Sequence, residues 1–434
     1  MLKAFRKLWK DDRGNVLIIG GAALPMLIGA AGLATDTIQW ALWKRQLQRA
    51  ADSAAIAGVY DRIQNNGTDG TLAVVNHDLT LNQHTGIGLL GGFPAVTYPA
   101  DVGEIRNQVA VTLAVRKSLA FSSLFLSEAP MIRVSATAAS TPGTDDYCVV
   151  SLENTTKSGI LASGTAQVIM DCGMITNSVS SNAAAAQGSS GVVATVIAAA
   201  GGIQQSNNWT VGKYDPYVPA ETDPYATLAP DATDMGTSCV GAPILTGGNG
   251  AGSNWGPGCY SGIDIGSNKT ANLAAGTYYI SGGTVNIQGT LNANAPGGTT
   301  ILLTNANASP TAPIASFDMN AQAHLNLVAP TTGKWSGMAI YQDRRAIDNS
   351  PTGNLSSSSP NKINGGSAGA IQGVLYFPKQ QITYNGGGNT AASCAQFVIK
   401  RIVFTGNNGT NLSSDCEGAG YQPIVGGRRV RLVA

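Results

Sequence analysis

The chain has 434 residues, a length that predicts two or three domains and excludes a single small module. Only 12% of the residues are charged and 6% are aromatic, while glycine reaches 54, which is typical of a β-rich, exported protein. Lysine and arginine total 26 against 25 acidic residues, so the chain lacks the broad positive field that a nucleic-acid partner needs, and we expect no nucleic acid.

The first recognisable element is an uncharged apolar run from Gly14 to Thr35. At about 1.5 Å per residue, a helix over 14–35 crosses a bilayer core of about 30 Å. Residues 1–13 form a basic segment, which favours a cytoplasmic N-terminus and export of everything after residue 36. The alternative is a cleaved signal peptide, but the run is longer than the usual apolar region of such a peptide and ends without an A-x-A site. We therefore expect an uncleaved single-pass anchor.

The helical pattern continues beyond the apolar run. Between Asp36 and Tyr60, apolar residues recur at helical spacing near one face: Ile38, Ala41, Leu42, Leu47, Ala50, Ala51, Ala54 and Ala55. One continuous helix from Gly14 to Gly58 would be about 65 to 70 Å long, far more than a bilayer needs. Its outer half must therefore bury this apolar face against the exported part or against a partner subunit, as in a pilin-type first helix.

Residues 36–140 are predicted to complete a small module containing helices and strands. Strict alternation predicts strands in NQVAVTLAVRK, which starts at Asn107, and in MIRVSATA, which starts at Met131. The apolar run SLAFSSLFL from Ser118 predicts a short helix between them, and a further helix is expected around 72–81. His77 and His84 have no neighbouring ligand residues, so no metal site is expected there.

Residues 141–434 change to short apolar alternations separated by Gly, Asn and Ser. This pattern favours a parallel β-helix, whose coils stack their apolar residues, because two-residue hairpin turns are scarce. A long antiparallel sandwich is the alternative. The Ala/Ser/Gly-rich and acidic stretch between Thr176 and Thr237 is predicted to be a decorated edge rather than core. The fold class is thus an α+β N-terminal module, with a long transmembrane helix and a small sheet, followed by an all-β, β-helix-like exported domain.

All six cysteines follow the apolar run, and none forms a C-x-x-C pair. In an oxidising compartment this pattern favours disulfides over zinc. Sequence-adjacent pairing would close three local loops, each worth about 3 kcal/mol. We expect Cys148 with Cys172, Cys239 with Cys259, and Cys394 with Cys416; free buried thiols are the alternative.

No hydrolase, phosphate-binding or metalloprotease motif occurs in the chain. The best candidate for catalysis is a polar cluster that would suit polysaccharide cleavage, although an exposed ion-paired loop is preferred. It consists of Tyr341, Gln342, Asp343, Arg344, Arg345 and Asp348. A second cluster could offer oxygens to calcium, although a solvated acidic loop is preferred. It consists of Asp215, Glu221, Asp223, Asp231 and Asp234. We therefore expect no catalytic residue, cofactor or metal.

The N-terminal stretch resembles the TadE/TadG-like proteins of Flp (tight adherence) pilus assembly. It shares an Arg-Gly-Asn entry, an Ala-Leu-Pro within the apolar run, an Asp just after that run, and the ending R-Q-L-Q-x-A-A-D-x-A-A-x-A-G between Arg45 and Gly58. The residue five after Gly14 is Ile19 rather than the Glu of processed pilins, so cleavage by a prepilin peptidase is not expected. The D-x-S-x-S metal site of some TadG-like proteins is missing.

This resemblance implies a non-enzymatic, membrane-anchored component of pilus assembly or surface adhesion. It would be a single-pass protein of the bacterial inner membrane, with its bulk periplasmic or surface-exposed. Its expected partners are the membrane and other pilus-assembly or pilin-like subunits, which the N-terminal helix would contact; an envelope glycan is a further candidate partner. The alternative function is an anchored carbohydrate-active enzyme or glycan-binding adhesin that uses a β-helix groove.

Overall fold

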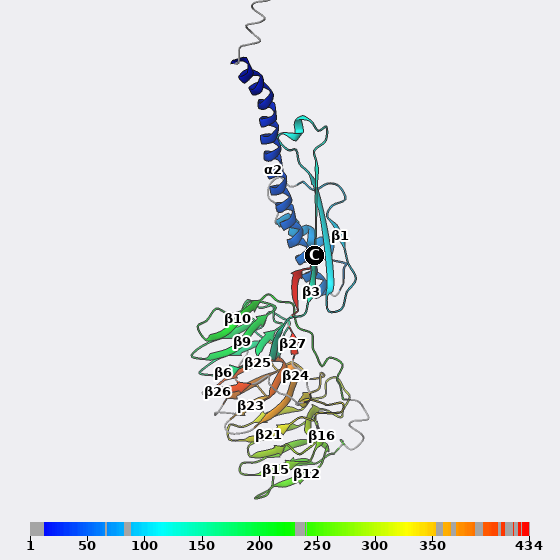
Figure 1. Ribbon diagram of the computed structural model, residues 1–434. Helices are drawn as coiled ribbons and strands as arrows, with labels where there is room; N and C mark the ends of the chain where they lie inside the picture. Colours follow the sequence, from blue (N-terminus) through cyan, green and yellow to red (C-terminus); the bar gives the residue numbers. More distant parts are fainter. Residues whose placement is uncertain are drawn as a thin grey trace, which may run out of the picture. The chain divides into compact units, whose positions relative to one another are not determined.

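The computed structural model describes residues 13–65, 67–81, 88–230, 239, 241–352, 359–365, 370–386, 394–406, 409–412, 420, 424–426 and 428–433. The chain divides into two compact units (Figure 1). The first unit extends to Thr141 and also contains Val430–Ala434, and the second unit is Pro142–Arg429. The last residues of the chain therefore return to the first unit, whereas the sequence predicted one β domain over 141–434.

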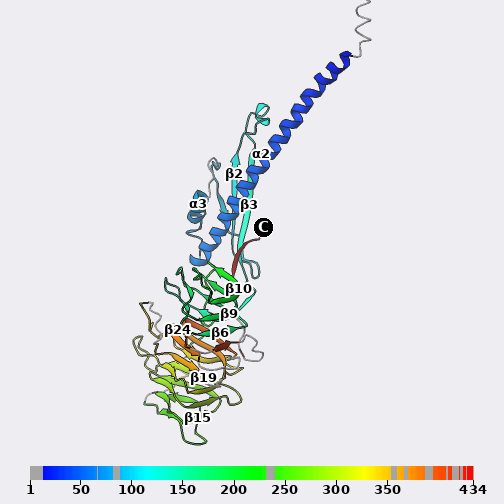
Figure 2. The same cartoon turned by 90° about the vertical axis from the view of Figure 1, so that its left-hand side faces the viewer.

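A single helix, α2 (Arg13–Asn65), forms the beginning of the first unit and confirms the predicted continuous helix (Figure 2). Its length and composition suffice to cross a membrane. Between Ile19 and Leu33 its large apolar side chains are exposed, as expected of a surface that lipid covers. Apart from Asp36, burial along α2 starts at Leu47, so Ile38 and Leu42, which were predicted on the buried face, remain exposed.

The outer half of α2 packs on a small sheet and a second helix. The elements are α3 (Thr71–Leu81), β1 (Ala95–Thr97), β2 (Arg106–Arg116), β3 (Met131–Thr141) and β28 (Arg429–Leu432), with the sheet order β1-β2-β3-β28. β2 and β3 pair antiparallel with Val111 opposite Ala136, so their alternating apolar residues share one face. That face and the helix form one core, which contains Leu47, Ala51, Ala54, Ala55, Val59, Val109, Val111, Leu113, Ile132 and Val134.

The predicted helix at SLAFSSLFL is wrong, because this segment forms a loop with one short 3-10 helix, η1 (Ser122–Leu124). Leu119 is buried, but Leu124 and Phe125 are exposed. A helix this short needs packing along its whole length to be stable, whereas this segment contacts α2 locally, at Phe121 and Ser122. We call residues 118–130, which connect β2 to β3, the hairpin tip.

The second unit consists of many short strands. The strands before residue 217 are β4 (Asp145–Ser151), β5 (Ile160–Ala162), β6 (Gln167–Met170), β7 (Gly173–Thr176), β8 (Ala184–Ala186), β9 (Gly191–Ala199) and β10 (Trp209–Pro216). The next group is β11 (Ile244–Thr246), β12 (Ser253–Trp255), β13 (Gly258–Tyr260), β14 (Gly262–Ile265), β15 (Thr270–Leu273), β16 (Gly276–Ser281), β17 (Thr284–Ile287), β18 (Thr290–Ala293) and β19 (Thr299–Thr304). The last group is β20 (Ser316–Met319), β21 (His324–Val328), β22 (Met338–Gln342), β23 (Lys362–Gly365), β24 (Ile371–Gly386), β25 (Ala395–Thr405), β26 (Gly409–Leu412) and β27 (Ile424–Gly426).

Most of these strands pair in parallel with the strand three places further along the chain, for example β11 with β14, β14 with β17, and β17 with β20. The register stacks like positions, so that Val285 lies next to Ile263 on one side and Phe317 on the other. Their side chains belong to one continuous apolar core. The pairing of β27 with β4 is antiparallel, but the ladders that build the core are parallel, which rules out the antiparallel sandwich.

The spatial order of the strands differs from their order in the chain. The long strand β25 pairs in parallel with both β4 and β5, so residues near 400 lie beside residues near 150. From there the chain builds outward through β7 and β9 to β10, and β11 then starts a second series that returns through β24 to β25. Figure 1 shows the green early strands and the orange late strands side by side.

The prediction of a decorated edge between Thr176 and Thr237 is wrong for its first part. β8 and β9 belong to the core, and the alanines from Ala183 to Ala186 are buried. β8 pairs in parallel with β5, with Ala184 next to the buried Ile160. Residues 231–238 lie outside the described part of the chain.

Candidate functional site

The most informative site lies where α2 meets the hairpin tip. The carboxylate of Asp36, which follows the apolar run, accepts a hydrogen bond from the backbone N–H of Phe121 at 2.8 Å. It also accepts hydrogen bonds from the N–H and the hydroxyl of Ser122. Only 3% of Asp36 is exposed. A carboxylate beside a lipid-facing surface is costly unless it is hydrogen-bonded, and the tip supplies the donors.

Gly32 lies one turn before Asp36, on the same face of α2. A Cβ atom at Gly32 would overlap the aromatic ring of Phe121, so only glycine lets this ring approach the helix so closely. The tip is thus held to α2 at two successive turns, by ring packing at Gly32 and by hydrogen bonds at Asp36. Figures 1 and 2 both draw the tip alongside the helix.

The end of the sequence motif shared with the TadE/TadG-like proteins has a packing role. Ala51, Ala54 and Ala55 are fully buried, and a Cβ at Gly58 would meet Val109 and Thr71. These small residues allow the helix to lie close to β2 and α3. The conspicuous motif therefore positions the sheet on the helix.

The cluster around residue 343 forms structural ion pairs. Asp343 is 6% exposed, and Arg345 donates to it at 2.8 Å. Burial raises the pKa of Asp343, but hydrogen bonds from Arg345 and Thr304 outweigh it and hold that pKa below its usual value. Its neighbours Tyr341 and Gln342 are buried as well. An ion-paired loop was the preferred interpretation, and the ion pair is present; Tyr341, Gln342 and Asp343 are buried, whereas Arg344 and Arg345 are partly exposed.

Arg344 binds the acidic loop that precedes residue 230. Its Nη1 donates to the carbonyl of Leu228 at 3.0 Å, and its Nε donates to the hydroxyl of Tyr376 at 2.7 Å. Asp223 accepts from the same hydroxyl at 2.7 Å, and burial together with this carboxylate raises the pKa of Tyr376. The loop thus forms a strap across several strands, since the backbone of Glu221 also exchanges hydrogen bonds with Asn177.

Among the described residues of the candidate calcium cluster, Asp215, Glu221 and Asp223 form no group whose carboxylate oxygens lie within 4.8 Å of one another. Asp215 pairs with Lys213 and Arg429, whereas Asp223 pairs with Arg344 at 3.7 Å. Each of these two carboxylates is therefore engaged by a cation of the chain itself, and a calcium ion would have to displace it. Asp231 and Asp234 lie outside the described residues.

A buried charge cluster that the sequence analysis missed is centred on Arg401. This arginine is fully buried in β25, and it pairs with the equally buried Glu153 and with Asp348. Asp348 also pairs with Lys400 at 2.9 Å. Burial raises the pKa of Asp348, but hydrogen bonds, with that of Lys400 the strongest, hold it below its usual value. A charged pair inside the apolar run AQFVIKRIVFT was the signal that could have revealed this cluster.

Two cysteine pairs lie at disulfide distance. The Cα atoms of Cys148 and Cys172 are 5.8 Å apart, and those of Cys239 and Cys259 are 5.0 Å apart. Cys394 is also disulfide-bonded, but Cys416 lies outside the described residues. Both bridges join segments close in sequence, so each closes a local loop.

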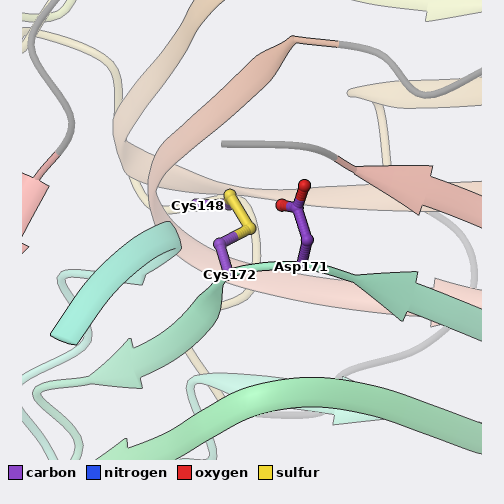
Figure 3. A group of neighbouring side chains, drawn as sticks. All are labelled: Cys148, Asp171 and Cys172. Atoms are coloured by element: carbon purple, nitrogen blue, oxygen red, sulfur yellow. A yellow bond between two sulfur atoms is a disulfide. The ribbon is translucent and has the colours of Figure 1, made fainter. Parts of the chain in front are cut away.

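The carboxylate of Asp171 lies beside the first bridge (Figure 3). Among the described residues, Cys148, Asp171 and Cys172 are the group whose ligand atoms approach within 4.8 Å of one another. A metal would need the two sulfurs as thiolates. In the disulfide they are bonded to each other, so the oxidised site leaves one carboxylate, which does not fit a structural metal.

We expect the non-reduced full-length protein to react with no thiol reagent, and six thiols to appear after unfolding and reduction. The reason is that the cysteines of the two described bridges and Cys394 are disulfide-bonded and therefore have no free thiol. Alkylation followed by peptide mass spectrometry measures this. Modification of Cys148 or Cys259 before reduction would contradict the bridges, and modification of four or more cysteines would overturn the whole scheme.

A protein-family model described as putative Flp pilus-assembly TadE/G-like matches residues 14–61. This stretch of α2 is therefore similar to that family. The match contains Gly32, Asp36 and the small residues that end at Gly58, so this TadE/G-like segment carries the residues that hold the tip and the sheet. No curated protein and no solved structure matches the chain.

Proposed function

We propose that this protein is a non-enzymatic, membrane-anchored component of Flp-type pilus assembly that presents an exported β domain. The observation that carries the proposal is the TadE/G-like match on α2, whose apolar first part is exposed and whose second part is packed on a sheet. The first part of such a helix suits contact with lipid, and its second part is stabilised by packing in a folded domain. Such a helix positions the domain, which supports a structural role.

The anchor is proposed to cross the bacterial inner membrane once, with the N-terminus in the cytoplasm and both units in the periplasm or at the surface. The basic residues before Gly14 support this orientation. The cysteine pairs at disulfide distance support an oxidising compartment for the second unit. The exposed apolar face between Ile19 and Leu33 is the surface that would contact lipid and the helices of pilin-like subunits.

The second unit is proposed to be a parallel β-helix that serves as a rigid binding face for other assembly components. Parallel ladders between every third strand, and the stacked column of Ile263, Val285 and Phe317, support that architecture. Asp343 and Arg344, the best candidates for sugar cleavage, are occupied by structural contacts with Arg345, Leu228 and Tyr376. These contacts favour a binding role over glycan chemistry.

Deletion of the gene should abolish piliation, and the full chain supplied in trans should restore it. A chain in which a cleavable signal sequence replaces residues 1–35 exports the same two units without the anchor, and it should not restore pili. An unrelated apolar helix of equal length in place of residues 14–31, which keeps Gly32 and Asp36 for the tip contact, is the matched control. The chain with this helix should be found in the membrane fraction but should not restore pili, because the helix lacks the side chains that would contact pilin-like helices.

Electron microscopy of pili and fractionation of membranes provide the measurements. Pili formed with the unanchored chain would refute the anchoring role. Pili formed with the unrelated helix would refute specific helix contacts.

A further inference from the structure

The hairpin tip carries an apolar cluster that the described residues of the first unit leave exposed. Leu124 is 74% exposed, Phe125 is 73% exposed and Leu126 is 51% exposed. Three consecutive large apolar residues at the end of a hairpin are costly in water, at about 25 cal/mol for each Å² left uncovered. In the same segment Leu119 is buried and Phe121 packs over Gly32, so the tip has one face against the helix and one face outward.

The contacts of the tip fix its level along α2. Phe121 lies at Gly32 and Ser122 lies at Asp36, and these two helix positions are at the end of the uncharged run 14–35. At about 1.5 Å per residue, they are only about 6 Å apart along the helix axis. The tip therefore stands at the level where a bilayer that surrounds the apolar run must end.

The next turns of α2 have the composition of a membrane interface. Ile38 and Leu42 are exposed, which extends the apolar surface beyond Asp36. The ammonium of Lys44 lies 5.1 Å from the ring of Trp40, and that of Lys117, at the base of the tip, lies 4.3 Å from the ring of Trp43. Aromatic rings paired with lysines are typical of the headgroup level, where the rings contact acyl carbons and the ammonium groups contact phosphates.

We infer that the hairpin tip is a second membrane contact, in which Leu124, Phe125 and Leu126 insert into the outer interface of the bilayer that α2 crosses. This inference rests on the proposed membrane anchoring. Asp36 then lies within the interface with its carboxylate satisfied by the N–H groups of Phe121 and Ser122, which removes the usual cost of an acidic group at that depth. Helix and tip together would restrict the rotation and tilt of the first unit relative to the membrane more than the helix alone.

The test places a spin label at single cysteines in the full chain, with its disulfides intact, reconstituted in phosphatidylcholine and phosphatidylglycerol nanodiscs. Leu124→Cys is the test position. Val102→Cys is the matched control, since Val102 is 67% exposed and lies beyond the opposite end of β2. Met26→Cys, on the exposed apolar part of α2, reports the anchor itself. Power saturation then compares collisions with oxygen, which concentrates in lipid, and with a water-soluble nickel chelate.

The label at position 124 should collide with oxygen at least about threefold more, relative to nickel, than the label at position 102. If the ratio of oxygen to nickel collisions is equally low, as in water, at positions 124 and 102 but high, as in lipid, at position 26, the tip contact alone is overturned. Water-like values at all three positions would overturn the anchoring. Spin coupling between copies at 124, with protection from both quenchers, would assign the cluster to a second copy of the chain and also overturn the inference. Asp36→Ala should shift the label at 124 toward water, since it removes the acceptor that holds the tip.

Discussion

Replacement of Arg401 by methionine should be among the most destabilising single substitutions in the second unit. Arg401 and Glu153 are both fully buried, so the variant leaves a carboxylate inside the fold without its cation. Removal of one partner from such a pair costs about 3 to 5 kcal/mol of unfolding free energy, a large share of the 5 to 15 kcal/mol that is typical of a domain. Thermal unfolding of the full chain in detergent, followed by circular dichroism of the β signal, would measure the loss.

A second substitution separates charge from packing. In the Arg401→Met background, Glu153→Gln removes the orphaned charge but leaves an oxygen that can accept from the N–H and hydroxyl of Thr155. We expect this double variant to recover at least about 1 kcal/mol. Lys362→Met is the control, because the pair of Lys362 with Asp318 is about one-third exposed and should contribute no more than about 1 kcal/mol. Equal losses for Arg401→Met and Lys362→Met would contradict the assigned role.

Phe317→Ala should destabilise the same unit by about 3 to 5 kcal/mol, because it opens a cavity in the stacked core. Phe317 is 1% exposed and lies in register with Val285, which in turn lies in register with Ile263. The cavity would interrupt this column, and the neighbouring strands cannot collapse into it without breaking their hydrogen-bond ladders. Urea unfolding monitored by circular dichroism would give the change in midpoint.

Ile169→Ala tests whether the loss of unfolding free energy on truncation depends on burial of the side chain or only on its position in a strand. Ile169 is half exposed in β6, between the buried Val168 and Met170. Its truncation should change the unfolding free energy by no more than about 0.5 kcal/mol. A loss at Ile169 as large as that at Phe317 would show that the inward and outward faces have been assigned incorrectly.

The sequence revealed the parts of the site that depend on local pattern. The uncharged run, the continuous helix and the motif ending at Gly58 were all evident, because a helix places residues three and four apart on one face whatever surrounds it. The contact partner of Asp36 was not evident. The donors of Phe121 and Ser122 lie about 85 residues away, and the segment that contains them was predicted to be a helix.

The clusters of polar residues show the same limit: the sequence reveals neighbours in the chain but not their contact partners. Asp343 and Arg344 are neighbours in the chain and were rightly treated together, but only the fold shows that one pairs with Arg345 and the other binds the strap at Leu228. Arg401 attracted no notice because its two acidic partners lie 248 and 53 residues away. A buried charge is tolerated only when an opposite charge or a hydrogen-bonding group lies beside it, and the tertiary fold decides which residues lie there.

By itself, the sequence determined that an apolar helix precedes a sheet-forming region and that short strands, interrupted by turn residues, fill the remainder. Period and composition are local properties that survive in any arrangement of the elements. Only the tertiary structure decided that β25 lies against β4 and β5, that the alanines of β8 belong to the core, and that the last strand returns to the first unit. The reason is that pairing between strands some 250 residues apart depends on which buried surfaces fit together, and the local sequence pattern of each strand does not determine that fit.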